Sequence, residues 1–166
     1  MASEENNGFP RDVNQVPFTN IDSFGVVKSA PTAFVGGTTD ARGDSGGTQA
    51  SYTLFNVTGD VLVRIYGVCT TLLASTTGTL EVGVTGNTAA LIAQTTATDI
   101  DANEIWNDST PVVGVELLSN VLGPYIIVNG LDILEKTATA DITSGNIYYI
   151  CLWRPLSRDG SVVSAV

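Results

Sequence analysis

Short strand-forming segments follow one another from residue 51 almost to the end of this 166-residue chain, and this succession constrains the fold most. Each segment is rich in Val, Ile, Leu, Thr or aromatic residues and is bounded by Gly, Asn, Asp or Pro. The segments are residues 52–57, 61–69, 79–84, 89–95, 111–118, 125–130, 131–138 and 146–155. They predict an all-β domain, residues 51–166, built as an antiparallel β-sandwich or jelly roll.

Two turns in this region predict which strands pair locally. The sequence Thr58-Gly59-Asp60 predicts a hairpin between the segments on either side of it. The sequence Thr85-Gly86-Asn87 turns the chain between the next two segments in the same way. Residues 101–108 lack strand alternation, so we expect an irregular loop or a single helical turn, held in place by Trp106.

Residues 1–50 differ from the rest of the chain. They hold three of the six prolines, several glycines and isolated apolar residues without helical or strand periodicity. This composition predicts an extended N-terminal arm and a Gly-rich connector, the alternative being a disordered tail. The expected anchor points of the arm are Phe9, Val13, Val16, Phe18, Ile21 and Phe24. The β-domain is expected to fold without residues 1–45.

One predicted strand, residues 147–153, is apolar on both faces. One face carries Ile147, Tyr149, Cys151 and Trp153, and the other carries Tyr148, Ile150 and Leu152. A strand at the centre of the core, covered by a second layer, explains this pattern, and so does a subunit contact. We predict a homo-oligomer with Tyr148, Ile150 and Leu152 near the subunit interface.

The stretch "DARGDSGGTQ", residues 40–49, contains two well-known short motifs. Arg42 to Ser45 spell the integrin-recognition tetrapeptide, and Gly43 to Gly47 match the sequence around the nucleophile of chymotrypsin-like proteases. A serine nucleophile of that type needs an imidazole base, and the chain has no histidine. We therefore expect residues 40–49 to be a connector without adhesive activity, and the protein not to be an enzyme.

Candidate sites for metals and cofactors are weak. Asp99, Asp101 and Asn103 have the opening spacing of a calcium loop, but Glu104 stands where the glycine of that loop belongs. The glycines near residue 40 are not followed by the Lys and Ser/Thr of a phosphate-binding loop. Cys69 and Cys151 do not have the spacing of zinc ligands. The sequence allows them to be either two free thiols or one disulfide. We expect no metal and no cofactor.

Charge limits the partners. The chain has 17 acidic and 7 basic residues, a net charge of -10, which opposes attraction to nucleic acid or to an anionic membrane. The first 20 residues contain Glu4 and Glu5 and no apolar run, so they do not resemble a secretory signal. We expect the protein to start in the cytosol, with no nucleic-acid partner and no membrane partner.

Two stretches resemble a known class of proteins. The first is residues 76–108, which contain the Gly86-Asn87 turn and the Asp101–Trp106 loop. The second is residues 153–166, which begin Trp-Arg-Pro-Leu-Ser. Both resemble small β-rich virion proteins of tailed bacteriophages. The resemblance covers roughly residues 51–166. It implies a head accessory protein of the decoration or cement type, which is often trimeric and has an extended arm.

The resemblance therefore implies a structural virion protein, localised in the virion and assembled in the host cytoplasm. We expect it to decorate the capsid, binding the major capsid protein of the head shell through the N-terminal arm and the β-domain. The alternative is a receptor- or carbohydrate-binding β-module of a phage tail, fibre or spike. That alternative needs exposed aromatic residues lining a groove, such as Tyr52, Tyr66, Tyr125 and Trp106.

Overall fold

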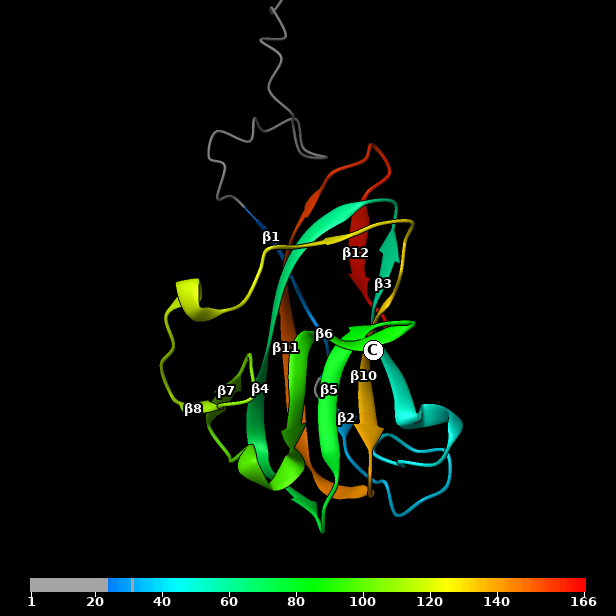
Figure 1. Ribbon diagram of the computed structural model, residues 1–166, viewed down its shortest axis with the longest axis vertical. Helices are drawn as coiled ribbons and strands as arrows, with labels where there is room; N and C mark the ends of the chain where they lie inside the picture. Colours follow the sequence, from blue (N-terminus) through cyan, green and yellow to red (C-terminus); the bar gives the residue numbers. More distant parts are fainter. Residues whose placement is uncertain (1–23, 31) are drawn as a thin grey trace, which may run out of the picture.

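The computed structural model describes residues 24–30 and 32–166, and the strands in these ranges form two antiparallel sheets packed face to face (Figure 1). The larger sheet has the order β1-β11-β4-β7-β8, with β2 also paired to β11 and β9 also paired to β4. The smaller sheet has the order β12-β3-β10-β5-β6. This arrangement confirms the expected all-β antiparallel sandwich.

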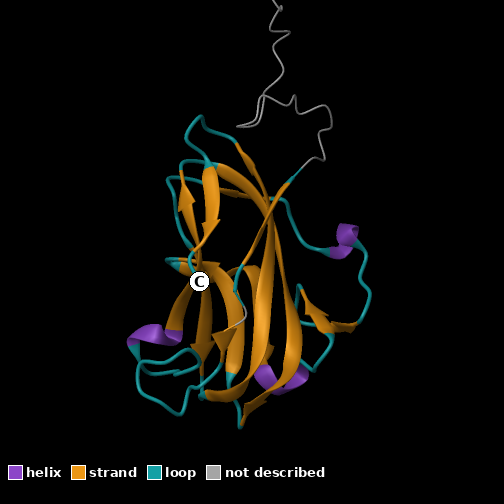
Figure 2. Cartoon of the chain, turned by 180° about the vertical axis from the view of Figure 1, so that it is seen from behind, coloured by secondary structure: helices purple, strands orange, loops and turns teal. Residues whose placement is uncertain are grey.

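The strands of the larger sheet are β1 (Gly25–Lys28), β2 (Thr32–Ala33), β4 (Val61–Ser75), β7 (Glu104–Trp106), β8 (Val112–Val113), β9 (Tyr125–Ile127) and β11 (Ile142–Pro155). Those of the smaller sheet are β3 (Ser51–Thr58), β5 (Thr79–Val84), β6 (Asn87–Thr96), β10 (Ile133–Ala138) and β12 (Ser161–Ser164). Short 3-10 turns in the described chain are η1 (Thr48–Ala50), η2 (Ala97–Asp99) and η3 (Leu118–Asn120), seen in Figure 2. Across the same residues, no helix has the length and apolar character to cross a membrane.

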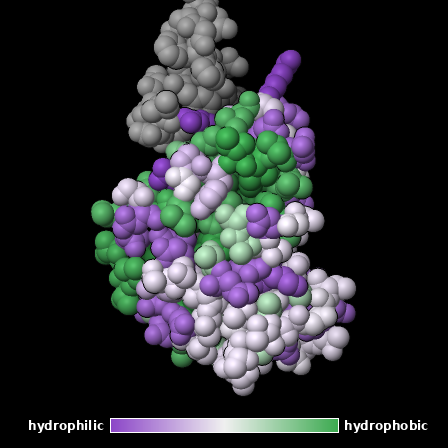
Figure 3. Space-filling model, in the orientation of Figure 1, coloured by the Kyte–Doolittle hydropathy of each residue, from purple (hydrophilic) through white to green (hydrophobic). Residues whose placement is uncertain are grey.

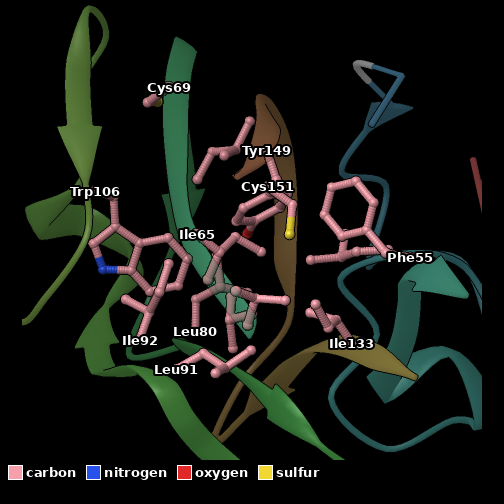
Figure 4. Close-up of a cluster of buried hydrophobic side chains, with 14 of the residues drawn as sticks. Phe55, Ile65, Cys69, Leu80, Leu91, Ile92, Trp106, Ile133, Tyr149 and Cys151 are labelled. Atoms are coloured by element: carbon pink, nitrogen blue, oxygen red, sulfur yellow. The ribbon is translucent and has the colours of Figure 1, made fainter. Parts of the chain in front are cut away.

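The hydrophobic core lies between the two sheets, because alternate side chains of each strand point inward. In β4, Val61, Val63 and Ile65 are buried while the residues between them are only half-buried. Figure 4 shows side chains of both sheets meeting there, including Trp106 and Tyr149, whose rings lie 6.2 Å apart. Complete burial of side chains of this size stabilises the fold by about 1.5–3 kcal/mol each.

Local turn chemistry predicts one hairpin correctly and one wrongly. Strands β5 and β6 pair across Thr85-Gly86, with Gly86 at φ 86°, a conformation that favours glycine. The expected hairpin across Thr58-Gly59-Asp60 is wrong, because β3 belongs to the smaller sheet and β4 to the larger one. The turn at Gly59 instead carries the chain from one sheet to the other.

The segment between β7 and β10 differs most from expectation. The predicted strand at 111–118 is reduced to the two residues of β8, and it ends at Gly114, whose φ is 75°. A β-strand requires negative φ, so this glycine stops the pairing. Residues 115–124 then form a loop that contains η3, and only β9 returns to the sheet.

Residues 24–30 and 32–50 belong to the sandwich, in contrast to the expected arm and connector over 1–50. Strands β1 and β2 both pair with β11, and Phe34 is buried in the core. The cause is hydrogen bonding and burial that the isolated apolar residues of this region did not reveal. A deletion of residues 1–45 would therefore remove two strands of the domain, β1 and β2. We accordingly revise the expectation that the domain folds without these residues.

Arg42 holds this part of the chain in place. Its guanidinium lies between the sheets, 4% exposed, and forms an ion pair with Glu135 of β10, with 2.5 Å from Nη2 to Oε2 and 2.9 Å from Nε to Oε1. It also donates to the carbonyl oxygens of Thr32 and Ile147. The Tyr149 hydroxyl donates to the same carboxylate at 2.6 Å. One polar network therefore joins both sheets to residues 32–42.

Electrostatics agree with this arrangement. Burial alone would lower the pKa of Arg42, but the Glu135 carboxylate raises it above its ordinary value. Burial, together with the same carboxylate, raises the pKa of Tyr149 well above its usual range. Arg42 therefore stays charged and Tyr149 stays a neutral donor at any physiological pH.

Candidate interaction surface

The register of the larger sheet brings side chains from six strands onto one outward surface. Directly paired residues of antiparallel strands point to the same side of a sheet. We use the name "outer face" for the following residues, which lie opposite the core: Val26, Lys28, Leu62, Arg64, Tyr66, Val68, Ile105, Val112, Ile126, Tyr148, Ile150, Leu152 and Arg154. Most are half-buried by one another, and Val26 and Ile126 are about two-thirds exposed, at 67% and 66%.

Charge on the outer face is opposite in sign to that of the whole chain. Its charged residues are Lys28, Arg64 and Arg154, and no carboxylate occupies any of its positions, although the chain has 17 acidic and 7 basic residues. The remaining positions are aliphatic or tyrosine. The outer face is therefore an apolar surface with three added positive charges.

The cations are held by rings and carbonyl groups. Lys28 Nζ lies 3.7 Å from the ring centroid of Tyr148, and Arg64 Nη1 donates to the Leu118 carbonyl oxygen at 3.2 Å. Neither Lys28 nor Arg64 forms an ion pair with a carboxylate of the described residues. Partial burial raises the pKa of Tyr66, and the neighbouring Tyr148 adds a smaller effect in the same direction. These contacts leave the positive charge of Lys28 and Arg64 uncompensated by a neighbouring acid.

The predicted interface residues Tyr148, Ile150 and Leu152 all lie on the outer face. The other side of the same strand points into the core, with Ile147, Tyr149 and Cys151 fully buried and Trp153 partly so. The smaller sheet thus explains one apolar side of β11 and leaves the other unexplained. A role for the second side in a subunit contact stays a prediction.

Of the expected arm anchors, Phe9, Val13, Val16, Phe18 and Ile21 lie outside the described residues. Phe24 is described, and it is half-buried beside β1. The guanidinium of Arg154 lies 5.5 Å from the centroid of its ring, at the margin of the outer face. The structure therefore places one anchor next to that face.

A second surface feature was not predicted from the sequence. Large apolar side chains are exposed along residues 112–131, which we call the apolar segment: Val112, Val113, Val115, Leu117, Leu118, Leu122, Ile126, Val128 and Leu131. Val115 is 83% exposed. Figure 3 shows apolar surface at the top and along the left edge of the molecule, where Figure 1 places this segment. Surfaces of this kind commonly mark contacts with another protein.

Sequence reasoning missed the apolar segment because it assigned residues 111–118 to a strand. In a strand, alternate side chains would point into the core. The stop at Gly114 instead leaves Val115, Leu117 and Leu118 on the surface. The available signal was the combination of Gly114, Gly123 and Pro124 within an otherwise apolar stretch.

The protease-like motif forms a hydrogen-bonded loop. The backbone N–H and the hydroxyl of Ser45 both donate to Asp141 Oδ1, at 2.9 and 2.8 Å, and Asp44 accepts from the N–H groups of Asp40, Gly46 and Gly47. These backbone donors lower the pKa of Asp44. Because the arginine of the integrin-like tetrapeptide is buried against Glu135, the motif cannot present its guanidinium to a receptor.

The acidic loop after β6 uses its carboxylates locally. The N–H of Asp101 donates to Glu104 Oε2 at 2.7 Å, and Asn103 adopts a φ of 69°. Glu104, the residue that breaks the calcium-loop pattern, is 9% exposed and turns back on this backbone. Within residues 24–30 and 32–166, no group of three or more His, Cys, Asp or Glu side chains is placed to hold a metal ion.

Two of the shallow hollows on the described surface lie at the Ser45 loop and at the Gly59 turn. One is lined by Ser45, Ala74, Ser75, Thr76, Ala140, Asp141 and Thr143, and the other by Gly59, Asp60, Asn129, Ser157 and Asp159. Neither lining contains an aromatic residue. Trp106 is fully buried and donates its ring N–H to the Thr95 hydroxyl at 2.9 Å. Trp106 therefore lines no groove, whereas the other aromatic candidates, Tyr52, Tyr66 and Tyr125, are half-buried.

Both cysteines are buried free thiols on the inner face of the larger sheet. Burial raises the pKa of Cys69 to about 11 and that of Cys151 to about 12. The structure thus answers the choice between free thiols and a disulfide in favour of free thiols.

We expect iodoacetamide to leave both thiols unmodified at pH 8 in the folded protein, because the thiolate is the reacting form and neither sulfur is exposed. In concentrated guanidinium chloride both should react. Since the chain has two cysteines, intact-mass spectrometry reads the result directly. Rapid modification of Cys151 in the native protein would contradict the core described above.

Comparisons with known proteins found no family model, no curated protein and no solved structure that matches the chain.

Proposed function

We propose that this protein is a structural virion protein that decorates the head shell of a tailed bacteriophage. In this role it binds the major capsid protein through the apolar segment of its β-domain and through its N-terminal residues. It acts as a homo-oligomer, a trimer by analogy with decoration proteins, and is assembled in the host cytoplasm. The observation that carries the proposal is the apolar segment, residues 112–131.

The energetics of that segment favour a protein partner. Its exposed side chains are aliphatic, and each contributes about 1.5–3 kcal/mol when it is fully buried. Isolated soluble proteins seldom expose so many neighbouring aliphatic residues without a partner. A repeating shell offers the same contact many times, so that modest affinity for each copy adds up to firm attachment. The net charge of -10 argues for a protein shell and against nucleic acid as the surface that is bound.

The sequence resemblance supplies the class of particle, and the chemistry of the described residues agrees with a non-catalytic role. Ser45 donates to Asp141 and has no imidazole beside it, since the chain lacks histidine. The ion pair of Arg42 with Glu135 is buried between the sheets, where no substrate reaches it.

Replacing Val115 and Leu117 together by Asp should reduce attachment to heads by at least about tenfold, since two buried aliphatic contacts contribute about 3 kcal/mol or more. Both side chains are exposed, at 83% and 67%, so folding should be unaffected. The measurement is co-sedimentation of labelled protein with purified heads of the phage that encodes it, followed through a sucrose cushion.

The matched control is Val163→Asp, because Val163 is also exposed but lies on β12, outside residues 112–131. It should bind heads like the unmodified protein. Equal binding by the Val115/Leu117 variant and the unmodified protein would remove the support that the apolar segment gives to the proposal.

A further inference from the structure

We infer that the outer face of the larger sheet binds residues 1–23 of a second copy of this chain. This inference deepens the proposed homo-oligomer by naming the segment and the surface that meet. It does not rest on attachment to a shell, because it concerns contact between copies alone.

The first argument is charge complementarity. Residues 1–23 contain four acidic side chains, Glu4, Glu5, Asp12 and Asp22, and one basic side chain, Arg11, so their side-chain charge is 1 - 4 = -3. The outer face carries three cations and no carboxylate. Opposite charges on two surfaces steer their encounter and disfavour other pairings. The segment is therefore net negative, whereas the outer face is net positive.

The second argument is apolar complementarity. The N-terminal residues include Phe9, Val13, Val16, Phe18 and Ile21, spaced two to four positions apart. Between its cations the outer face offers aliphatic and tyrosine side chains, and Val26, which lies outside the apolar segment, is 67% exposed. An apolar side chain of the segment would cover surface that the smaller sheet cannot reach, because the smaller sheet packs on the opposite side.

The third argument is geometric. Strand β1 lies at the margin of the larger sheet, with Gly25 paired to Trp153, and its first residues are near the end of β11 (Figures 1 and 2). Residues 1–23 therefore join the described chain at one edge of the larger sheet. A 23-residue segment spans at most ~75 Å, whereas four strands cover only ~15 Å, so reach is ample.

Acidic groups near the outer face do not cancel its charge. Glu116 lies in the loop that Arg64 contacts at Leu118, and its carboxylate accepts from the Leu117 N–H and the Asn120 side chain. The Glu116 carboxylate is therefore engaged in hydrogen bonds within its own loop. Lys28 and Arg64 therefore remain the groups that an incoming carboxylate would meet.

A reciprocal charge exchange in the full-length chain tests the inference. The face variant carries Lys28→Glu and Arg64→Glu, and the segment variant carries Glu4→Lys and Glu5→Lys. The measurement is sedimentation velocity over a concentration series at moderate salt. We expect the unmodified chain to self-associate and each variant alone to associate at least about tenfold more weakly, since each change converts attraction into repulsion.

Mixing the two variants should restore association, because the acidic face of one chain then meets the basic segment of the other. The chain that carries all four changes should likewise associate like the unmodified protein. High salt should weaken association of the unmodified chain. Recovery in the mixture is the result that only exchange between copies produces.

The matched control is Lys136→Glu with Arg158→Glu, which changes the net charge by the same amount but lies off the outer face. It should associate like the unmodified protein. If charge reversal unfolds the face variant, as judged by circular dichroism, the neutral pair Lys28→Gln and Arg64→Gln replaces it, and a smaller loss of association is expected.

An unmodified chain that stays monomeric would overturn the inference, as would a mixture that fails to recover. The Val115/Leu117 variant separates the two proposals, since it should lose shell binding and keep self-association.

Discussion

Deletion of residues 1–45 should unfold the protein, whereas deletion of residues 1–23 should leave the sandwich intact. The longer deletion removes β1, β2, Phe34 and Arg42. Loss of a buried phenylalanine costs about 3–5 kcal/mol. Leaving Glu135 buried without its cation costs about 3–5 kcal/mol more. The sum of about 6–10 kcal/mol approaches the whole stability of a typical domain, about 5–15 kcal/mol.

Circular dichroism and thermal denaturation of the two truncated chains provide the measurement. The shorter deletion is the matched control, because it ends just before the first described residue, Phe24. A cooperative melt of the chain that begins at residue 46 would contradict the assignment of residues 24–45 to the sandwich.

Replacing Arg42 by Met should destabilise the protein by about 3–5 kcal/mol, because a carboxylate then stays buried without a counter-charge. For a chain of this size that loss lowers Tm by roughly 6–20 °C. Urea denaturation followed by fluorescence measures the change in the free energy of unfolding. The effect is large because Glu135 is 1% exposed, so bulk water does not solvate its carboxylate.

The double variant Arg42→Met with Glu135→Leu is the informative partner of this experiment. It removes both charges and should recover most of the lost stability, as buried ion pairs replaced by apolar side chains commonly do. Lys136→Met, next to Glu135 but half-buried at the surface, should change stability by less than about 0.5 kcal/mol. Equal stability of the Arg42→Met variant and the unmodified chain would show that the network contributes nothing.

The sequence predicted elements whose signals are local. The β5–β6 hairpin follows from Gly86, and the alternation in β11 correctly separated Tyr148, Ile150 and Leu152 from the core residues between them. The turn at Gly59 carries equally strong local chemistry but joins the two sheets. Its outcome depends on the pairing of β3 with β10 and β12, and these partners lie more than 70 residues along the chain.

The candidate surface shows the same limit. Tyr148 and its alternate neighbours could be assigned to one face from a single strand. The three cations beside them come from β1, β4 and β11, and only the sheet register brings Lys28, Arg64 and Arg154 together. The ion pair of Arg42 with Glu135 joins residues 93 positions apart, and neither residue stands in a pattern that marks it as buried.

Electron cryomicroscopy of the phage heads tests the central claim, that this chain is a structural component of the virion, most directly. We predict density for the β-sandwich on the exterior of the head, with residues 112–131 against the major capsid protein and the outer face of the larger sheet turned toward a neighbouring copy. Heads that lack this density, in a particle preparation that contains the protein, would contradict the account.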